Sequence, residues 1–140
     1  MSDIKVKVES EQVLAALRTL IHNAKVMLPV YDTIGRKLVN RSRMAYRTGT
    51  SPNGAPWTKL KTRKGQPLRD TGRMLRSMTH VAMADGVDIG TNVAYAPYHQ
   101  FGTDKGIPPR PFLPVDSMPP PWAKDIFESI TGHLNKGINA

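Results

Sequence analysis

The 140-residue sequence contains no cysteine. This absence excludes disulfide bonds, zinc sites built on thiolates and catalysis by a thiol. Apolar residues make up 39% of the chain, and they nowhere form the run of about 18 that a membrane-spanning helix needs. The first ten residues, MSDIKVKVES, have an early acidic residue and no apolar centre. We therefore expect no signal peptide there and no membrane partner.

Motifs of covalent chemistry are also scarce. No two of the four histidines have the spacing that zinc hydrolases use on a helix, and no glycine-rich phosphate loop is present. His99, with Asp104 nearby, is the only candidate for a catalytic pair. A lone histidine beside aromatic residues is more often packed or hydrogen-bonded than catalytic. We predict no enzymatic activity, no cofactor and no metal site, and an enzyme centred on His99 is the least favoured alternative.

Proline and glycine, in contrast, are abundant, with 12 and 11 residues. They separate apolar segments of clear periodicity, which indicates ordered loops rather than disorder. A length of 140 residues suits one hydrophobic core, and the sequence contains no internal repeat. Residues 1–140 are therefore predicted to form a single domain.

Local signals place the elements along the chain. Pro29 should kink or break the first helical pattern, and Gly49 should end the second. The pair Asp85–Gly86 between two short strands is typical of a hairpin turn. Gly102 should end a short helix that has Pro97 in its first turn. The expected elements are a strand at 4–8, helices at 10–28 and 31–49, a short helix at 72–78, a hairpin at 79–91, a short helix at 95–102 and a last helix at 122–136.

These elements predict an α+β fold. The N-terminal helices should pack on a small, mostly antiparallel sheet. A long basic loop is expected at about 48–70. A proline-rich extended arm is expected at about 103–121, since its prolines forbid a helix and leave few donors for a sheet.

The positive charge is concentrated in one segment. The chain carries a net charge of +9, and residues 36–76 hold twelve Lys or Arg against one acid, Asp70. That segment is therefore +11 and the remainder about −2 by the same count. Such a field attracts phosphate or an acidic protein surface. A solvated face that keeps the protein soluble is the alternative interpretation.

Four blocks of sequence resemble the phage virion morphogenesis, or tail-completion, family of tailed bacteriophages. They are SPNGAPWTKL (51–60), LRDTGRMLRSM (68–78), DIGTNVAYAPYHQFG (88–102) and IPPRPFL (107–113), and they occur in the family's order. One departure is Pro109, where the family more often has a small residue. The matching positions are Pro52, Gly54, Trp57 and Leu60; Leu68, Arg69, Thr71, Gly72, Leu75 and Ser77; Tyr95, Ala96, His99 and Gly102; and Ile107, Pro108, Arg110, Pro111 and Phe112.

The resemblance implies a structural protein at the head–tail junction, in the neck or tail of the particle, assembled in the cytoplasm of the bacterial host. It implies no enzyme activity. Because a tail is a tube, we expect a homo-oligomeric ring, six- or twelve-fold, with head-to-tail contacts between subunits. The expected neighbours are the head–tail adaptor, the tail tube and the tail terminator proteins.

Within the blocks, several residues are candidates for structural or interface roles. Tyr95, Tyr98 and Phe101 should be anchors of the core or of an interface. The alternative is that Tyr95, Phe101 and Phe112 simply fill the subunit's own core. Trp57 should anchor the basic loop rather than bind a ligand. The remaining candidates match positions of the blocks, and they are Arg69, Gly72 and Gly102.

Two polar residues of the blocks have more specific expected roles. We expect His99 to hydrogen-bond to backbone in its turn. We expect Arg110, flanked by prolines, to be held out rigidly so that it pairs with a carboxylate or a phosphate.

The basic patch of the loop comprises Lys59, Lys61, Arg63 and Lys64. It has two possible partners, which the sequence leaves open. One is DNA passing through the channel, contacted through its phosphates. The other is an acidic surface on a neighbouring phage protein. The alternative function is a free-standing, non-sequence-specific nucleic-acid-binding protein with helix 30–47 on DNA, although the chain has no recognisable helix-turn-helix.

Overall fold

The structure, a computed structural model, describes residues 10–60 and 72–138. Its helices and antiparallel hairpin make an α+β fold, which confirms the predicted class. The strand predicted at 4–8 and residues 61–71 of the basic loop lie outside the described residues. The elements are α1 (Ser10–Lys25), α2 (Leu28–Thr48), α3 (Arg73–Ser77), β1 (Thr79–Met83), β2 (Gly86–Gly90), α4 (Ala96–Phe101) and α5 (Pro120–Leu134).

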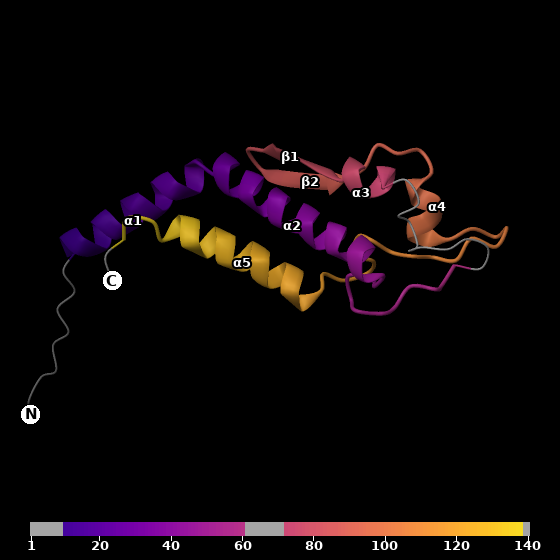
Figure 1. Cartoon of the computed structure of the whole chain (residues 1–140). Coiled ribbons are helices and arrows are strands. Elements are labelled where there is room, and N and C mark those ends of the chain that lie inside the picture. Colours follow the sequence, from indigo (N-terminus) through magenta and orange to yellow (C-terminus); the bar gives the residue numbers. More distant parts are fainter. Residues whose placement is uncertain (1–9, 61–71, 139–140) are drawn as a thin grey trace, which may run out of the picture.

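Helix α2 runs through the centre of an elongated molecule, with the β1–β2 hairpin on one side and α5 on the other (Figure 1). Its buried residues Val30, Ile34 and Leu38 form one apolar cluster with Trp122 of α5. They recur every four residues, so they lie on one face of the helix. This face joins α2 to α5.

Tyr46, near the end of α2, is the centre of a second apolar cluster and is fully buried. The ring of Trp57 meets it edge-on with centroids 5.7 Å apart, and the ring of Phe112 lies 5.4 Å away. Aromatic pairs in such arrangements stabilise a fold beyond the area they bury. Tyr46 therefore ties both the loop after α2 and the proline-rich segment to the same helix.

The break predicted at Pro29 is confirmed. Helices α1 and α2 are separated by Val26 and Met27 and are bent by 60° relative to each other. Pro29 occupies the first turn of α2, where a missing amide hydrogen costs no helical hydrogen bond. Among the described residues no single helix is long and apolar enough to cross a membrane, and α1 and α2 meet that criterion only as this bent pair.

Glycines end α2 and α4, as predicted. Gly49 has a φ of 67°, and its N–H bonds to the carbonyl of Ala45 at 2.9 Å. Gly102 has a φ of 75°, and a Cβ there would come within 2.9 Å of the carbonyl oxygen of Ile107. Only glycine fits both the left-handed conformation and the close approach of the following segment.

The predicted hairpin is present, but its turn lies one residue earlier than predicted. Met83 pairs with Gly86, so the two connecting residues are Ala84 and Asp85. The prediction of an Asp85–Gly86 turn is therefore wrong. Both turn residues have negative φ, so this turn does not need the conformational freedom of glycine, and Gly86 is free to begin β2.

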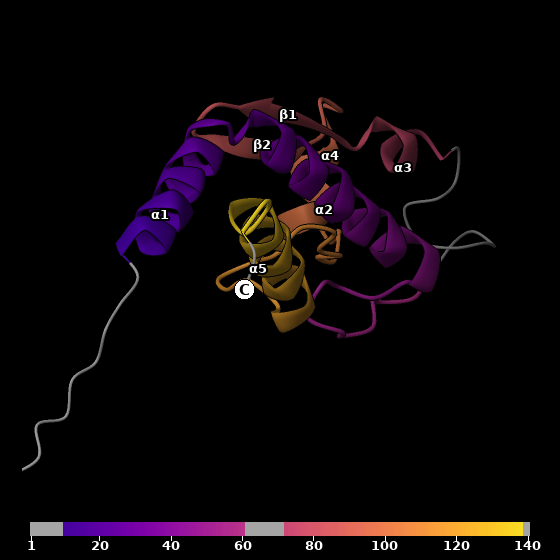
Figure 2. The same ribbon diagram turned by 90° about the vertical axis from the view of Figure 1, so that its left-hand side faces the viewer.

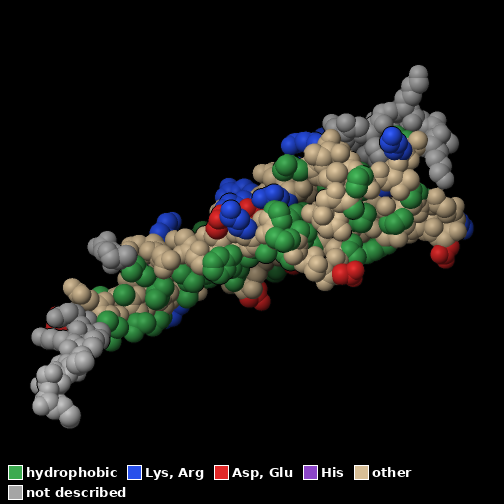
Figure 3. Space-filling view, turned by 90° about the horizontal axis from the view of Figure 1, so that it is seen from below, with side chains coloured by type: hydrophobic (Ala, Val, Ile, Leu, Met, Phe, Trp, Pro, Cys, Tyr) green, Lys and Arg blue, Asp and Glu red, His purple; other side chains and the backbone are tan. Residues whose placement is uncertain are grey.

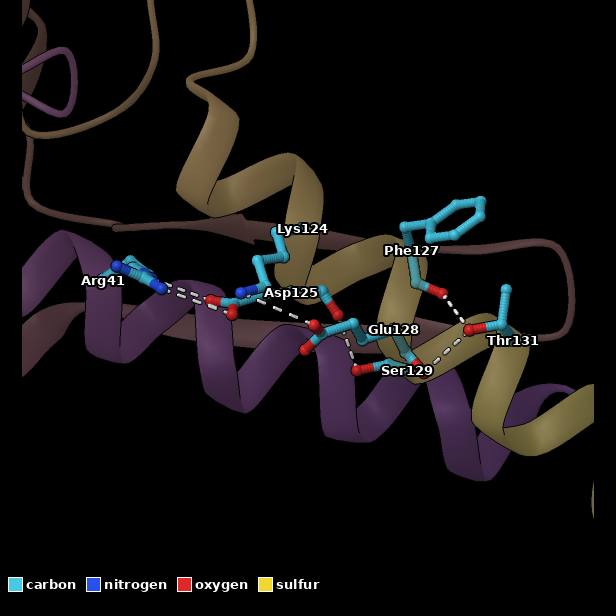
Figure 4. A network of polar contacts seen from close by, with 7 residues as sticks. All are labelled: Arg41, Lys124, Asp125, Phe127, Glu128, Ser129 and Thr131. Carbon is cyan, nitrogen blue, oxygen red and sulfur yellow. Dashed lines mark hydrogen bonds and ion pairs between the residues drawn. The ribbon is translucent and has the colours of Figure 1, made fainter.

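Polar contacts fix the hairpin and α5 on α2. On the hairpin side, the His80 Nε2 atom lies 2.8 Å from Asp32 Oδ1. On the α5 side, Arg41 donates to both carboxylate oxygens of Asp125, at 2.8 and 3.3 Å (Figure 4). Helix α5 begins at Pro120, two residues before the predicted start, because prolines are accommodated in a first helical turn.

Helix α1 meets the N-terminal end of α2 at an angle (Figure 2). It also contacts α5. The Asn23 side-chain amide donates to the carbonyls of Leu134 and Lys136, each at 2.9 Å. His133 Nε2 donates back to the Asn23 carbonyl at 2.8 Å. These bonds hold α1 in a fixed direction while leaving most of its surface uncovered.

Candidate assembly site

Gln100 of α4 holds the proline-rich segment against the body of the protein. Its side-chain oxygen accepts the N–H groups of Phe112 and Leu113 at 3.0 and 3.1 Å. Its amide nitrogen donates to the Leu113 carbonyl at 2.8 Å. The buried glutamine therefore replaces the neighbouring strand that an extended segment would otherwise need. The sequence analysis missed this residue, and the only signal was the presence of two amide donors in a segment otherwise rich in proline.

Arg110 is buried, with 7% of its surface exposed, which contradicts the prediction that it is held out to a partner. Its Nε atom donates to the Thr58 carbonyl at 2.8 Å, and Nη2 lies 3.3 Å from the Lys59 carbonyl. Alternate residues of an extended chain face the same side, so Arg110 points inward together with Phe112. The guanidinium ties the proline-rich segment to the start of the basic loop.

His99 contributes its main chain to the turn. Its carbonyl accepts the Arg110 N–H at 2.7 Å. The Nδ1 atom of its ring is buried and has no hydrogen-bond partner among the described residues, so the expected side-chain bond is not made by this nitrogen. Burial of the ring, and then the nearby positive charge of Arg110, lower the pKa of His99. The folded protein therefore favours the neutral imidazole.

The other candidates separate into packing residues and surface residues. Trp57 and Phe112 are buried, and the indole N–H of Trp57 bonds to the Pro111 carbonyl at 2.9 Å. Gly72 precedes α3 with a φ of 72°. Arg69 lies outside the described residues. Trp57 thus anchors the part of the loop that the structure describes.

Tyr98 and Phe101 form an exposed pair on α4, which we call the aromatic turn. Phe101 is 69% exposed, and Tyr98 lies three residues before it, on the same face of the helix. Tyr95 is partly exposed, and the Cζ atom of Arg73 lies over its ring, 5.8 Å from the ring centroid. An open hollow of about 440 Å³ adjoins Phe101. The aromatic turn therefore offers an apolar surface at the end of the molecule opposite α1 (Figure 1).

A second exposed apolar surface lies on α1, and we call it the α1 stripe. It comprises Val13, Leu14, Leu17 and Ile21, which are 42–54% exposed. Seen from below, hydrophobic side chains gather over this end of the molecule (Figure 3). The periodicity of the sequence predicts this amphipathic helix, but it did not indicate that the apolar face lacks a cover within the described chain.

The basic residues of the segment differ in their surroundings, since some are bonded within the chain and others are exposed. Three basic residues of α2 contact residues outside this helix: Lys37 contacts Ser129, Arg41 contacts Asp125, and Arg43 contacts the Met78 carbonyl. Of the basic patch, Lys59 is described and exposed, whereas Lys61, Arg63 and Lys64 lie outside the described residues. Much of the charge on α2 therefore fastens the hairpin and α5 in place.

Residues 10–60 and 72–138 contain no group of three or more His, Asp or Glu that could hold a metal ion. The two exposed apolar surfaces are the most distinctive features that remain. Their chemistry is that of protein–protein contact.

Comparison with known proteins agrees with this interpretation. Residues 8–135 match the model of the phage virion morphogenesis family. The chain belongs to this family. It is 31% identical over 131 residues to the Mu-like prophage FluMu G protein 2 of Haemophilus influenzae, an alignment that covers 89% of this chain and 91% of that protein. No solved structure matches the chain significantly. A phage virion morphogenesis role is therefore established, and the predicted family is confirmed.

Proposed function

We propose that the chain is a structural subunit of the phage head–tail junction, where it forms a homo-oligomeric ring that completes the tail and allows it to join the filled head. The observation that carries the proposal is the presence of two separate apolar surfaces, the α1 stripe and the aromatic turn, at opposite ends of an elongated subunit. A ring subunit at a junction needs separate surfaces for contact with its own copies and for contact with a neighbouring phage protein. Both surfaces lie on helices held by the rest of the fold.

The proposed location is the neck or tail of the particle, after assembly in the host cytoplasm. The ring would contact the head–tail adaptor on one side and the tail tube or terminator on the other. Contact with DNA in the channel is a further part of the proposal and depends on the basic patch. Membership of a virion morphogenesis family supports a place in particle assembly, and it agrees with a structural rather than an enzymatic role.

The structure gives less support to a free-standing nucleic-acid-binding protein. That alternative places helix 30–47 on DNA. Helix α2, which contains these residues, has the hairpin on one side and α5 on the other. Arg41 and Arg43 of this helix bond within the chain rather than projecting from a free basic face.

The proposal is tested by removing the gene from a phage or prophage that produces particles. We expect filled heads and separate tails in the lysate, and expression of the chain from a plasmid should restore joined particles. Phe101→Asp should fail to restore them, because a charge would be buried at the contact. Val81→Lys, which places a charge at an exposed apolar position of β1 opposite Asp88, is the control. Joined, infectious particles made without the chain would contradict the proposal.

A further inference from the structure

An apolar groove of about 330 Å³ lies between α2, β2 and α5. Leu38 of α2, Ile89 of β2 and Ile126 of α5 are among its lining residues. None of the described residues that line it is charged. The groove is partly open to solvent, and Ile34, Leu38 and Trp122 are the buried residues of its lining. An occupant must therefore present apolar side chains.

The apolar surface continues beyond the groove onto its rim. Phe127, next to the groove-lining Ile126, is 69% exposed and points away from α2 (Figure 4). Met118, at one end of the groove, is also exposed. Large exposed apolar side chains beside an apolar groove indicate a surface that a partner covers.

The α1 stripe matches the groove in chemistry, since both are apolar. It is a straight row of aliphatic side chains on a helix, which is the form in which helices occupy apolar grooves. It cannot reach the groove of its own chain. Only Val26 and Met27 separate α1 from α2, and Asn23 is bonded to the far end of α5. The stripe and the groove can therefore meet only between two copies.

The charges beside the two surfaces are complementary. Arg18 and Lys25 follow Leu14 and Ile21 by four residues, so they border the stripe on α1. Two exposed carboxylates lie near the groove. Asp85 is two residues from the lining residue Val87, and Asp116 is two residues from the lining residues Pro114 and Met118. A helix in the groove would thus bring basic residues toward acidic ones.

We propose that the α1 stripe of one copy docks into the α2–β2–α5 groove of the next copy, with Arg18 and Lys25 directed toward Asp85 and Asp116. This contact is heterologous, since each copy donates its helix and accepts with its groove. It closes into a ring if the rotation between copies permits. The inference rests on the proposed function in that it specifies the copy-to-copy contact of the ring, and it leaves the aromatic turn for a different neighbour.

The absence of cysteine allows a direct test, because any introduced thiol is the only one on its chain. One population of full-length chain carries Leu17→Cys, in the stripe, and a second carries Ile126→Cys, in the groove. The two are mixed, or produced together in cells that assemble particles, and then mildly oxidised. Dimers are separated without reductant. Mixing two populations removes any contribution from a bond within one chain.

We expect a disulfide-linked dimer from the mixture and little from either population alone. Adding Glu11→Gln to the Leu17→Cys chain should leave the yield unchanged. Adding Ile21→Asp should lower it by about tenfold or more, because an unpaired charge would enter an apolar groove. The matched control replaces Ile126→Cys by Val81→Cys, a thiol on the outer face of the hairpin, and should give no more dimer than collision does.

Two results would overturn the inference. One is a yield with Val81→Cys equal to that with Ile126→Cys. The other is a dimer formed as readily by Leu17→Cys alone, which would show that α1 pairs with α1. Neither result bears on whether gene removal leaves heads and tails unjoined. Conversely, a disulfide between positions 17 and 126 in the mixture, together with particles that still join after the gene is removed, would leave the contact intact and contradict only the proposed function.

Discussion

Gly35 of α2 lies directly against the ring of His80 of β1, and this contact sets the distance between helix and hairpin. A Cβ at position 35 would overlap the ring carbons of His80 and come within 2.8 Å of its Cβ. The ring cannot shift freely because its Nε2 atom is bonded to Asp32 at 2.8 Å. The hairpin can therefore lie this close to α2 only because residue 35 has no side chain.

Gly35→Ala should therefore destabilise the protein. Alanine in a helix interior gains about 1 kcal/mol of helix propensity over glycine. Overpacking against a fixed neighbour costs about 1–3 kcal/mol, and here the overlap favours the upper part of that range. We therefore expect a net decrease in the free energy of unfolding, measured by urea denaturation. Gly132→Ala in α5 is the control, since nothing lies within 4 Å of its added Cβ. It should be neutral or stabilising, and a similar loss in both variants would refute the explanation.

Arg110→Ala should also destabilise the protein, contrary to what an exposed charge would do. The substitution leaves the carbonyls of Thr58 and Lys59 without this donor. Loss of such hydrogen bonds costs about 1–3 kcal/mol. Lys105→Ala, at a nearby exposed position, should change the free energy of unfolding by less than about 0.5 kcal/mol. Equal stability of the two variants would restore the role of Arg110 as a projecting residue.

Local signals explain which parts of the fold could be predicted. Pro29, Gly49 and Gly102 act through their own backbone geometry, so the helix ends they impose can be predicted from the sequence alone. The alternation of the hairpin strands is equally local. The position of the turn cannot be predicted locally, because either Ala84–Asp85 or Asp85–Gly86 could form it. Packing on α2 fixes the register in which Met83 pairs with Gly86, and this register places the turn at Ala84–Asp85.

The candidate site was harder to predict because its roles depend on distant partners. Arg110 is buried only because the carbonyls of Thr58 and Lys59 lie opposite it in space. The bonds of Gln100 likewise depend on a segment more than ten residues away. The sequence indicates that the α1 stripe is amphipathic, but periodicity cannot tell whether an apolar face packs on its own chain or on another.

Stability should fall as the pH drops below about 6.5, and His99 should account for part of the fall. Its pKa is lowered in the folded protein, chiefly by burial. The unfolded chain therefore takes up a proton at a higher pH than the folded chain does, so stability is lost from there down to the folded-state pKa. His99→Gln should flatten the profile of urea midpoints between pH 8 and 5. Phe101→Leu, a neighbouring non-titrating change, should keep the wild-type slope.

The Arg41–Asp125 pair should contribute at neutral pH and vanish in acid. The hydrogen bond from Arg41 lowers the pKa of Asp125 in the folded state. Its contribution is thus complete above the unfolded pKa of about 3.9 and is lost as the pH falls below it. Asp125→Asn should cost up to about 1 kcal/mol at pH 7, since the pair is partly exposed. The difference in the free energy of unfolding between this variant and the wild type should disappear near pH 2. Glu128→Gln, which breaks the exposed pair with Lys124, should cost less than about 0.5 kcal/mol.

The partner of the basic patch can be decided by its response to salt. If Lys59, Lys61, Arg63 and Lys64 each contact a phosphate, binding to duplex DNA of any sequence should weaken with a log–log slope of roughly −3.6, since each contact releases about one counterion. Replacing all four by Glu should abolish that binding. If the patch docks an acidic protein, the purified chain should hold duplex only weakly at physiological salt, and the same variant should fail to join its neighbour in the particle.

We favour docking to protein, because a ring must hold its neighbours firmly while DNA slides through the channel. The described start of the loop agrees with a fixed surface, since Trp57 and the carbonyls of Thr58 and Lys59 are bonded to the proline-rich segment. A control variant with Lys105→Glu and Lys124→Glu changes two exposed charges elsewhere. It should leave both duplex binding and joining to the neighbour unchanged. Firm duplex binding at physiological salt, with a slope that depends on the four loop residues, would reverse this preference.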